Sequence, residues 1–323
     1  MTDLQKDFKL IRYDQQMSKV WDEFVMQSWN GVFLFKRQFM DYHSHKFTDH
    51  SLLAYHDNKL KALFPANENS GVLYSHQGLT YGGWITAPRL STEDLEQFFF
   101  LLEIYADENG FDEIQYKLKP TIFDQHLNDT DAWLLWKNNY ELWRRDLSFL
   151  IDFKNFAGFA RDKRYRLNKS SRNNLILEEK GNIVQFMDLV KDNLNKKYNT
   201  DPIHTAEEVT LLQSRFPNNI FTITIFQEDE FLGGTLLFVD NDFIHTQYLH
   251  FNEKGRNLCA PEFLIDNLMQ KYGKTKRYLS FGTSTENNGQ NLNSGLASFK
   301  EGFGAAGVCH DFYKKRITME IPY

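Results

Sequence analysis

The sequence predicts an α+β protein built from two related domains in tandem. The prediction rests on two series of strand-like and helix-like segments that follow each other in the same order. The first series runs through Ser51–His56, Lys59–Ala66, Val72–Ser75, a helix from Ser91, Ile114–Leu118 and Tyr140–Phe153. The second runs through Phe221–Gln227, Glu230–Val239, Phe243–Phe251, a helix from Pro261, Tyr278–Phe281 and Val308–Ile317. Equivalent segments lie roughly 170 residues apart, far beyond the period of a solenoid repeat.

Length and composition agree with this division. The chain has 323 residues, of which 41% are hydrophobic and 25% charged, as in globular proteins with ordinary cores. We therefore expect an N-terminal domain over 1–153 and a C-terminal domain over 154–323. The segment at the boundary, 153–160, is apolar and aromatic rather than rich in Gly and Ser, which predicts tightly packed domains.

In the first domain, apolar residues at helical spacing predict a helix over Met17–Ser28, and a short helix is expected over Phe35–His45. Ser91 or Thr92 caps a helix that runs to Asp107, with acidic residues in its first turn. Thr121–Asn138 is expected to be helical, and Glu141–Phe153 is expected to be a long strand.

The second domain opens with a basic helix and continues with helices over Ile183–Lys197 and Thr205–Arg215. Three strands rich in β-branched and aromatic residues span 221–251. A helix over 261–272, a strand over 277–281, a helix over Ser294–Phe303 and a last strand complete the domain.

Charge and cysteine content limit the classes of function. The net charge of −6 argues against general binding of nucleic acids, DNA included. Basic residues nevertheless gather in 154–172, either on a solvated helix or at an anionic ligand.

The two cysteines make no disulfide framework, no apolar run spans a membrane, and Met1–Leu10 lacks an apolar signal core. These features predict a cytoplasmic protein. Asp41, His43 and His45 suggest no complete ligand set, so no metal is expected.

Several motifs carry a family resemblance. In the second half these are Cys259-Ala260-Pro261 opening a helix, YLSFGTS at Tyr278–Ser284 and GLASFKEGFG at Gly295–Gly304; in the first half they are Asn30–Tyr42 and Ser75–Gly83. Together they resemble the tandem-GNAT superfamily of Fem-type acyltransferases, which includes peptidoglycan-bridge aminoacyltransferases and relatives that use acyl-CoA. The resemblance implies two tandem GNAT-like (acyl-CoA N-acyltransferase) domains, each a mixed, largely antiparallel sheet flanked by helices.

The resemblance places the acyl donor at a helix N-terminus in the second domain. Free backbone N–H groups and the helix dipole make such a terminus favourable for a pyrophosphate. The expected donor-binding residues are Lys254, Gly255, Arg256, Asn257 and Ala260. The chain departs here from the Q/R-x-x-G-x-G/A loop of ordinary GNAT enzymes. In the first domain the matching helix begins with acidic residues, which would repel a phosphate.

Other residues are candidates for the chemistry of acyl transfer. Gly233 and Gly234 would permit a bulge whose backbone N–H polarises an acyl carbonyl, or would simply form a turn. The resemblance implies that Phe299 and Lys300 lie near the reacting acyl group, where an ammonium stabilises the oxyanion. His245 or Tyr248 would handle the proton of the amine. We expect His245, Gln247 and Leu249 on one face of their strand, with Tyr248 and His250 on the other.

The resemblance also implies that the acceptor is bound by the first domain, in a cleft between the domains. Lys36 and Arg37 would face an anionic acceptor, with His76 and Tyr81 in a nearby polar loop.

The sequence thus predicts an enzyme, an N-acyltransferase that moves an acyl group from acyl-CoA to a primary amine of an amino sugar or cell-surface precursor. It would hold no tightly bound cofactor, and its partners would be the small-molecule donor and acceptor. One alternative is an aminoacyl-tRNA-dependent transferase that forms a peptide bond on a peptidoglycan precursor. A second alternative is a binding protein for a glycan or nucleotide-sugar without turnover.

Overall fold

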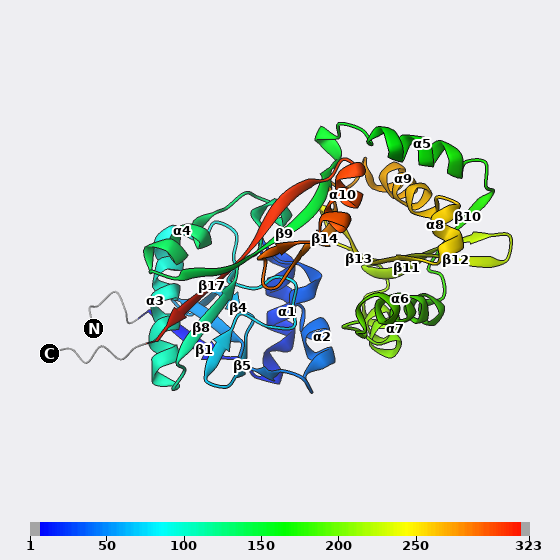
Figure 1. The fold of residues 1–323 in the computed structure, drawn as a ribbon. Coiled ribbons are helices and arrows are strands. Elements are labelled where there is room, and N and C mark those ends of the chain that lie inside the picture. The colour runs from blue at the N-terminus through cyan, green and yellow to red at the C-terminus, as the bar shows by residue number, and fades with distance from the viewer. Residues whose placement is uncertain (1–6, 318–323) are drawn as a thin grey trace. The chain divides into compact units, whose positions relative to one another are not determined.

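The structure is a computed structural model and describes residues 7–317 (Figure 1). Residues 1–6, on which the expectation of no export signal partly rests, lie outside this range. Contacts within the chain define two units: unit 1 extends to Asp146 and resumes at Cys309, and unit 2 is Leu147–Val308. Within 7–317 no helix is both long enough and apolar enough to cross a membrane.

The division differs from the boundary at 153/154 that the sequence suggests. The chain passes from one unit to the other at two points, and both lie inside strands, β9 (Glu141–Asp152) and β17 (Ala306–Arg316), rather than in loops. The second half of β17 pairs with β8 (Glu113–Lys117) of unit 1, Phe312 opposite Lys117 and Arg316 opposite Glu113. The end of the described chain is therefore part of the first unit.

In the described residues, unit 1 contains a four-stranded sheet, strands of a second sheet and four α-helices. Its strands and helices before β9 are β1 (Phe8–Arg12), α1 (Ser18–Gln27), α2 (Arg37–Met40), β2 (Thr48–Asp49), β3 (Leu52–His56), β4 (Lys59–Phe64), β5 (Asn67–Asn69), β6 (Val72–Tyr74), β7 (Ile85–Thr86), α3 (Thr92–Glu108), β8 and α4 (Thr130–Lys137). One sheet has the order β1-β3-β4-β7, and in the other β17, β8, β6, β5 and β2 are neighbours in that order. Ser91 caps α3 by accepting the N–H of Asp94, as expected.

Unit 1 has its core around α3. This helix buries Leu95, Phe98, Phe99 and Leu102 against inward-facing residues of β3, β4 and β8. The expected helix over Thr121–Asn138 is shorter than predicted, because only Thr130–Lys137 is α-helical. Before it, the Lys119 ammonium binds the Phe123 carbonyl and the Asp124 carboxylate, so this backbone is held in an irregular turn.

Unit 2 is built around a main sheet that is covered on both faces by helices. Besides the second half of β9, it comprises α5 (Arg161–Ser170), β10 (Leu175–Glu179), α6 (Ile183–Tyr198), α7 (Ala206–Arg215), β11 (Ile220–Gln227), β12 (Glu230–Val239), β13 (Phe243–Phe251), α8 (Glu253–Asn257), α9 (Ala260–Tyr272), β14 (Tyr278–Thr283), β15 (Thr285–Glu286), β16 (Asn291–Leu292) and α10 (Ser294–Gly302). The main strands lie in the order β10-β11-β12-β13-β14-β9, and only the β13–β14 pair is parallel. Helix α8 was not predicted.

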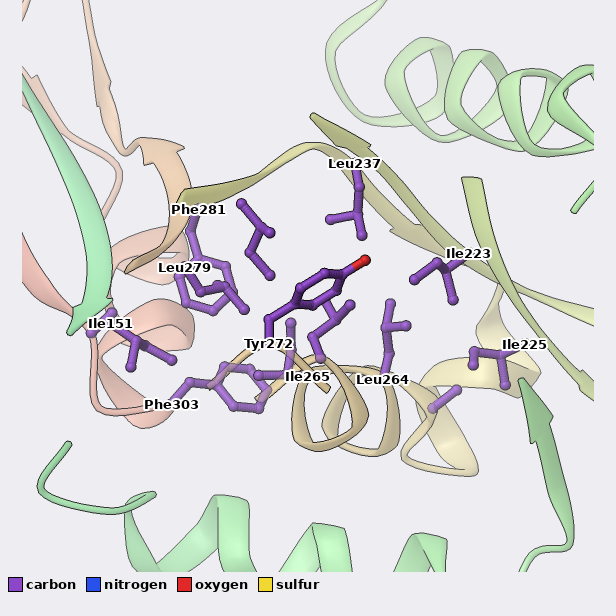
Figure 2. Close-up of a cluster of buried hydrophobic side chains, with 14 of the residues drawn as sticks. Ile151, Ile223, Ile225, Leu237, Leu264, Ile265, Tyr272, Leu279, Phe281 and Phe303 are labelled. Carbon is purple, nitrogen blue, oxygen red and sulfur yellow. The ribbon is translucent and has the colours of Figure 1, made fainter. Parts of the chain in front are cut away.

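The largest apolar cluster of unit 2 lies between this sheet and α9. Leu264, Ile265 and Tyr272 of α9 face Ile223, Leu237 and other strand residues, as Figure 2 shows. Helix α5 packs on α9, while α6 and α7 cover the opposite face of the sheet (Figure 1). The sheet is therefore buried on both sides, and its polar residues need partners.

The two units share one topological feature, which confirms the repeat. In unit 1, β6 and β8 are parallel and the chain between them includes α3; in unit 2, β13 and β14 are parallel and the chain between them includes α9. Parallel neighbours require such a crossover connection. In both units the parallel pairing covers only three positions, after which the two strands diverge.

Candidate active site

The divergence of β13 and β14 is the centre of the candidate site. The two strands pair from Phe243–Tyr278 to His245–Ser280. Beyond this point β14 pairs with β9, whereas β13 continues to Phe251 beside β12. In the described ladder, the edge of β13 from Thr246 onward therefore has no strand partner on the β14 side. Backbone N–H groups on such an edge can bind a carbonyl oxygen.

A bulge at Gln247 changes which side chains of β13 share a face. Thr246 pairs with Leu237 and Tyr248 pairs with Leu236, so Gln247 is the extra residue. Leu249 joins Ile244 and Phe251 in the cluster below α9, while Tyr248 and His250 contact the α6–α7 side. The expectation that His245 shares a face with Leu249 was therefore wrong, because a strict two-residue alternation does not continue through a bulge.

His245 lies at the last paired position and is linked to β14. Its Nδ1 is 3.0 Å from Ser280 Oγ, and Ser280 Oγ also accepts the N–H of Gly282 at 3.3 Å. Gly282 has φ +72°, and a Cβ at this position would lie 3.2 Å from the His245 ring. The absence of a side chain there lets the imidazole lie against the backbone at the divergence.

Lys300 of α10 contacts the end of β14, but its ammonium is used internally. Its Nζ donates to the carbonyls of Gly282 at 2.8 Å and Thr283 at 2.7 Å, and the residue is 3% exposed. Burial lowers the pKa of Lys300 to about 7. Phe299 packs against the apolar cluster and against Phe303. In this geometry Lys300 positions the end of β14, rather than pointing its charge at a bound acyl group.

Tyr248 belongs to a second polar group on the α6–α7 side. Its hydroxyl is 3.0 Å from His204 Nδ1, and burial raises the pKa of Tyr248. The neighbouring His250 lies 3.5 Å from the Asn193 amide, and burial lowers the pKa of His250 to about 4. His250 is therefore neutral near pH 7. His204 gave no signal in the sequence, because it lies in a loop far from the strand that it contacts.

The first turn of α9 contains an internal carboxylate. Glu262 is 1% exposed, and its Oε1 accepts from Lys163 Nζ at 2.9 Å and from Arg166 Nε at 2.8 Å. Both cations come from α5, the basic helix that packs on α9. A negative charge is favourable at a helix N-terminus, so this end of α9 is already neutralised by the protein itself.

The expected donor-binding residues precede this turn and form α8 instead of an open loop. Gly255 N–H donates to Asn252 Oδ1 at 2.7 Å, which caps α8, and the guanidinium of Arg256 donates to the Phe251 carbonyl at 2.5 Å. Lys254 pairs with Glu230, the Asn257 carbonyl accepts from Lys169, and Ala260 is buried. The Gly255 N–H and the cations of Lys254 and Arg256 thus have partners within the chain, which weighs against a pyrophosphate site at these residues.

Gly233 and Gly234 lie inside β12, between two paired strands. A Cβ on Gly233 would lie 2.4 Å from the His250 carbonyl oxygen, and one on Gly234 would lie 2.0 Å from that of Ile223. A bulge does occur beside them, because Gly233 pairs with Ile225 and Phe231 pairs with Phe226, which leaves Leu232 extra. The glycines thus allow close approach of three strands.

The residues expected to bind an acceptor are distributed over unit 1. Arg37 is buried and pairs with both Asp41 and Asp49, and its guanidinium lies 3.8 Å from the centre of the Tyr13 ring. Lys36, half-buried, occupies the N-cap of α2. Tyr81 is buried beside Phe123, and His76 lines a cavity. The matched charge of Arg37 favours a structural role.

Comparison with known proteins identifies the fold. No family model and no curated protein matches the chain. FemX superposes with a TM-score of 0.65 at 9% identity, over 95% of this chain and 97% of FemX. The C-terminal domain of a putative lysylphosphatidylglycerol synthetase from Agrobacterium fabrum gives 0.60 at 12% identity, over 93% and 91% of the chains. A tandem GNAT protein of the clavulanic acid pathway gives 0.53 at 7%, over 97% and 99%.

The chain therefore has the tandem GNAT fold. The similarity to FemX confirms the predicted fold class and, at the level of the fold, the resemblance to Fem-type proteins. At these identities the likeness concerns the fold, and function is argued from the site.

Proposed function

We propose that this protein is an acyltransferase that moves an acyl group to a primary amine at the divergence of β13 and β14. The observation that carries the proposal is the unpartnered edge of β13 beyond Thr246, next to the bulge at Gln247 and to His245. An acyl carbonyl that binds this edge is polarised by backbone N–H groups that need no reorganisation during the reaction.

The proposed step is an addition–elimination. The neutral amine attacks the carbonyl carbon, a C–N bond forms, and the bond from that carbon to the donor's oxygen or sulfur breaks. The amine loses one proton, which His245 accepts, and the leaving oxygen or sulfur takes up a proton. His245 Nδ1–H donates to Ser280 Oγ, which holds the imidazole and leaves Nε2 to accept the proton, and Lys300 holds the end of β14 at Gly282 and Thr283, against which the imidazole lies.

The two candidate donors differ in whether they need a pyrophosphate site at the first turn of α9. Acyl-CoA brings a pyrophosphate, and the first turn of α9 instead contains Glu262 with its two cations. An aminoacyl-tRNA carries its acyl group on a ribose oxygen and needs no pyrophosphate site. We therefore favour aminoacyl-tRNA as the donor, and acyl-CoA becomes the alternative.

Helix α5 supports this choice. Arg161 and Arg164 are exposed on it, Arg172 follows it, and Tyr165 is 71% exposed among them. Exposed cations bind phosphates, and an exposed aromatic ring can stack on an unpaired base. The acidic surface elsewhere is consistent with RNA contact limited to this helix. The acceptor remains a primary amine on an amino sugar or cell-envelope precursor.

A donor comparison tests the proposal. Transfer of labelled acyl groups to glucosamine and to a lysine-containing peptidoglycan precursor is measured with total aminoacyl-tRNA and with acetyl-CoA. We expect amide product with aminoacyl-tRNA, and loss of product in His245→Ala. Product from acetyl-CoA alone would overturn the assignment of aminoacyl-tRNA as the donor but would keep the assignment of the protein as an acyltransferase. Absence of product from both donors, with tight binding of tRNA, would favour a binding protein.

The contribution of α5 is tested by affinity for tRNA. The variant Arg161→Ala/Arg164→Ala/Arg172→Ala is compared with Lys191→Ala/Lys196→Ala/Lys197→Ala, three exposed lysines on α6. The logarithm of the tRNA binding constant falls linearly with the logarithm of the salt concentration, and each lost phosphate contact makes this slope shallower by about 0.7–0.9. We expect the slope to be shallower by about 2 in the α5 variant and unchanged in the control. Equal slopes would contradict RNA contact through α5.

A further inference from the structure

Unit 1 contains a cavity at the same topological place as the candidate active site of unit 2. Strands β6 and β8 pair from Val72–Glu113 to Tyr74–Gln115 and then diverge. Ser75 is still bonded to Gln115 and Lys117 of β8, and His76, with φ +66°, then turns the chain away. A cavity of about 220 Å³ opens there, lined among others by His76, Lys117, Trp143, Arg144 and Phe312. This volume suits one ring rather than a drug-sized ligand.

The cavity lining includes one ammonium, that of Lys117, which interacts with the Asp146 carboxylate only at longer range. This ammonium donates to three backbone carbonyls of the 76–79 loop, those of His76 at 3.5 Å, Gln77 at 3.4 Å and Leu79. Within residues 7–317 no carboxylate forms an ion pair with it. Arg144, by contrast, donates to both oxygens of Asp146, at 3.2 and 2.6 Å. The lining is therefore suited to a ligand with a single negative charge.

One wall of the cavity is formed by Phe312, Trp143 and Arg144. The guanidinium carbon of Arg144 lies 4.3 Å from the centre of the Phe312 ring, and Lys117 Nζ lies 5.7 Å from it. Trp143 meets the same ring edge-on at 6.3 Å. A planar ring bound here would stack on aromatic and guanidinium surfaces, as such groups favour.

Two polar atoms of the lining have no partner. Trp143 Nε1 and His76 Nδ1 are both buried without a hydrogen bond. His76 is 3% exposed, and burial lowers its pKa well below the ordinary value, so the ring is neutral. Buried polar groups in folded proteins are nearly always bonded, and an unpaired donor in a cavity wall is explained by a ligand that accepts from it.

We propose that this cavity binds an aromatic carboxylate, with the carboxylate at Lys117 and the ring along Phe312. The site is distinct from the proposed transfer centre and does not depend on its activity. After duplication of the fold, the divergence of the parallel strands carries chemistry in unit 2 and ligand binding in unit 1.

Titration of the full chain with benzoate, with neutral benzamide as the matched ligand, tests the proposal. We expect saturable benzoate binding at least tenfold tighter than benzamide binding. In ¹H–¹⁵N spectra the indole N–H of Trp143, assigned with Trp143→Phe, should shift with the same dissociation constant. Lys117→Met should weaken benzoate at least tenfold, while Lys59→Met, an exposed lysine of β4, should leave it unchanged.

Three results would overturn the inference. They are no saturable binding of benzoate, equal binding of benzamide, or benzoate binding without a shift of the Trp143 resonance. All three are measured on the unaltered protein, so they test the inference even if Lys117→Met does not fold.

Discussion

Glu262→Gln tests whether α9 begins on an internal ion pair or on a site open to a ligand. In the structure the buried carboxylate lies between Lys163 and Arg166, with side-chain exposures of 1%, 9% and 37%. Breaking a buried pair by neutralising one partner costs about 3–5 kcal/mol. Because Arg166 is partly exposed and the amide retains an acceptor oxygen, we expect the lower end, about 3 kcal/mol.

The assay exploits the position of the tryptophans. All six lie at or before Trp143, hence in unit 1, so their fluorescence follows unit 1 in a urea titration. Hydrogen exchange of peptides from α9, measured by mass spectrometry, follows unit 2. We expect faster exchange throughout α9 in Glu262→Gln and an unchanged fluorescence transition. The control is Glu301→Gln, an exposed position on α10.

A loss below about 1 kcal/mol, the scale of exposed pairs, would refute this reasoning. The Glu262 side chain would then be free to turn away from the first turn of α9, this helix N-terminus would be open to an anion, and acyl-CoA would again be the better donor.

Three further predictions concern stability. Burial lowers the pKa of Lys300 to about 7 from 10.5, so the folded chain binds fewer protons than the unfolded chain between these pH values. The stability of unit 2, measured by hydrogen exchange, should therefore rise with pH across this range, and Lys300→Met should remove that rise. Burial raises the pKa of Asp131, which accepts from the Tyr116 hydroxyl, to about 7 from 3.8. The stability of unit 1, followed by tryptophan fluorescence, should therefore fall as the pH rises from about 4 to 7, and an unchanged dependence of stability on pH in Asp131→Asn would contradict this. Gly233 has φ +134°, and a Cβ there would meet the His250 carbonyl, so Gly233→Ala should lower the free energy of unfolding by about 2 kcal/mol or more. The control Gly295→Ala, in α10, should raise it by up to about 1 kcal/mol, and equal melting temperatures of the two variants would count against the strand geometry.

The fold could be predicted because its signals are local and periodic. The hairpin strands, the Ser91 cap and the apolar stripe of α9 each depend on a few neighbouring residues, and their order repeats. The unit boundary could not be predicted, since it falls within β9 and β17, where pairing partners distant in sequence decide to which unit each half belongs.

The placement of the candidate site residues depends on tertiary pairings. His245 and Lys300 both contact the end of β14, through Ser280 and Gly282, and their catalytic roles stay predictions. A donor site at residues 254–260 stays a prediction, against which it weighs that Asn252 caps α8 and that Glu262 occupies the first turn of α9 beside Lys163. A single extra residue at Gln247 reversed the faces of β13. Such tertiary pairings leave no trace in composition or spacing.

The most direct test of the account is transfer from aminoacyl-tRNA to an amine, measured as the rate of amide formation in a single turnover at saturating enzyme. We predict product with the unaltered chain, a rate at least tenfold lower for His245→Ala, and a normal rate for Lys191→Ala on α6. An undiminished rate in His245→Ala, or amide formed only from acetyl-CoA, would contradict the proposed centre or its donor.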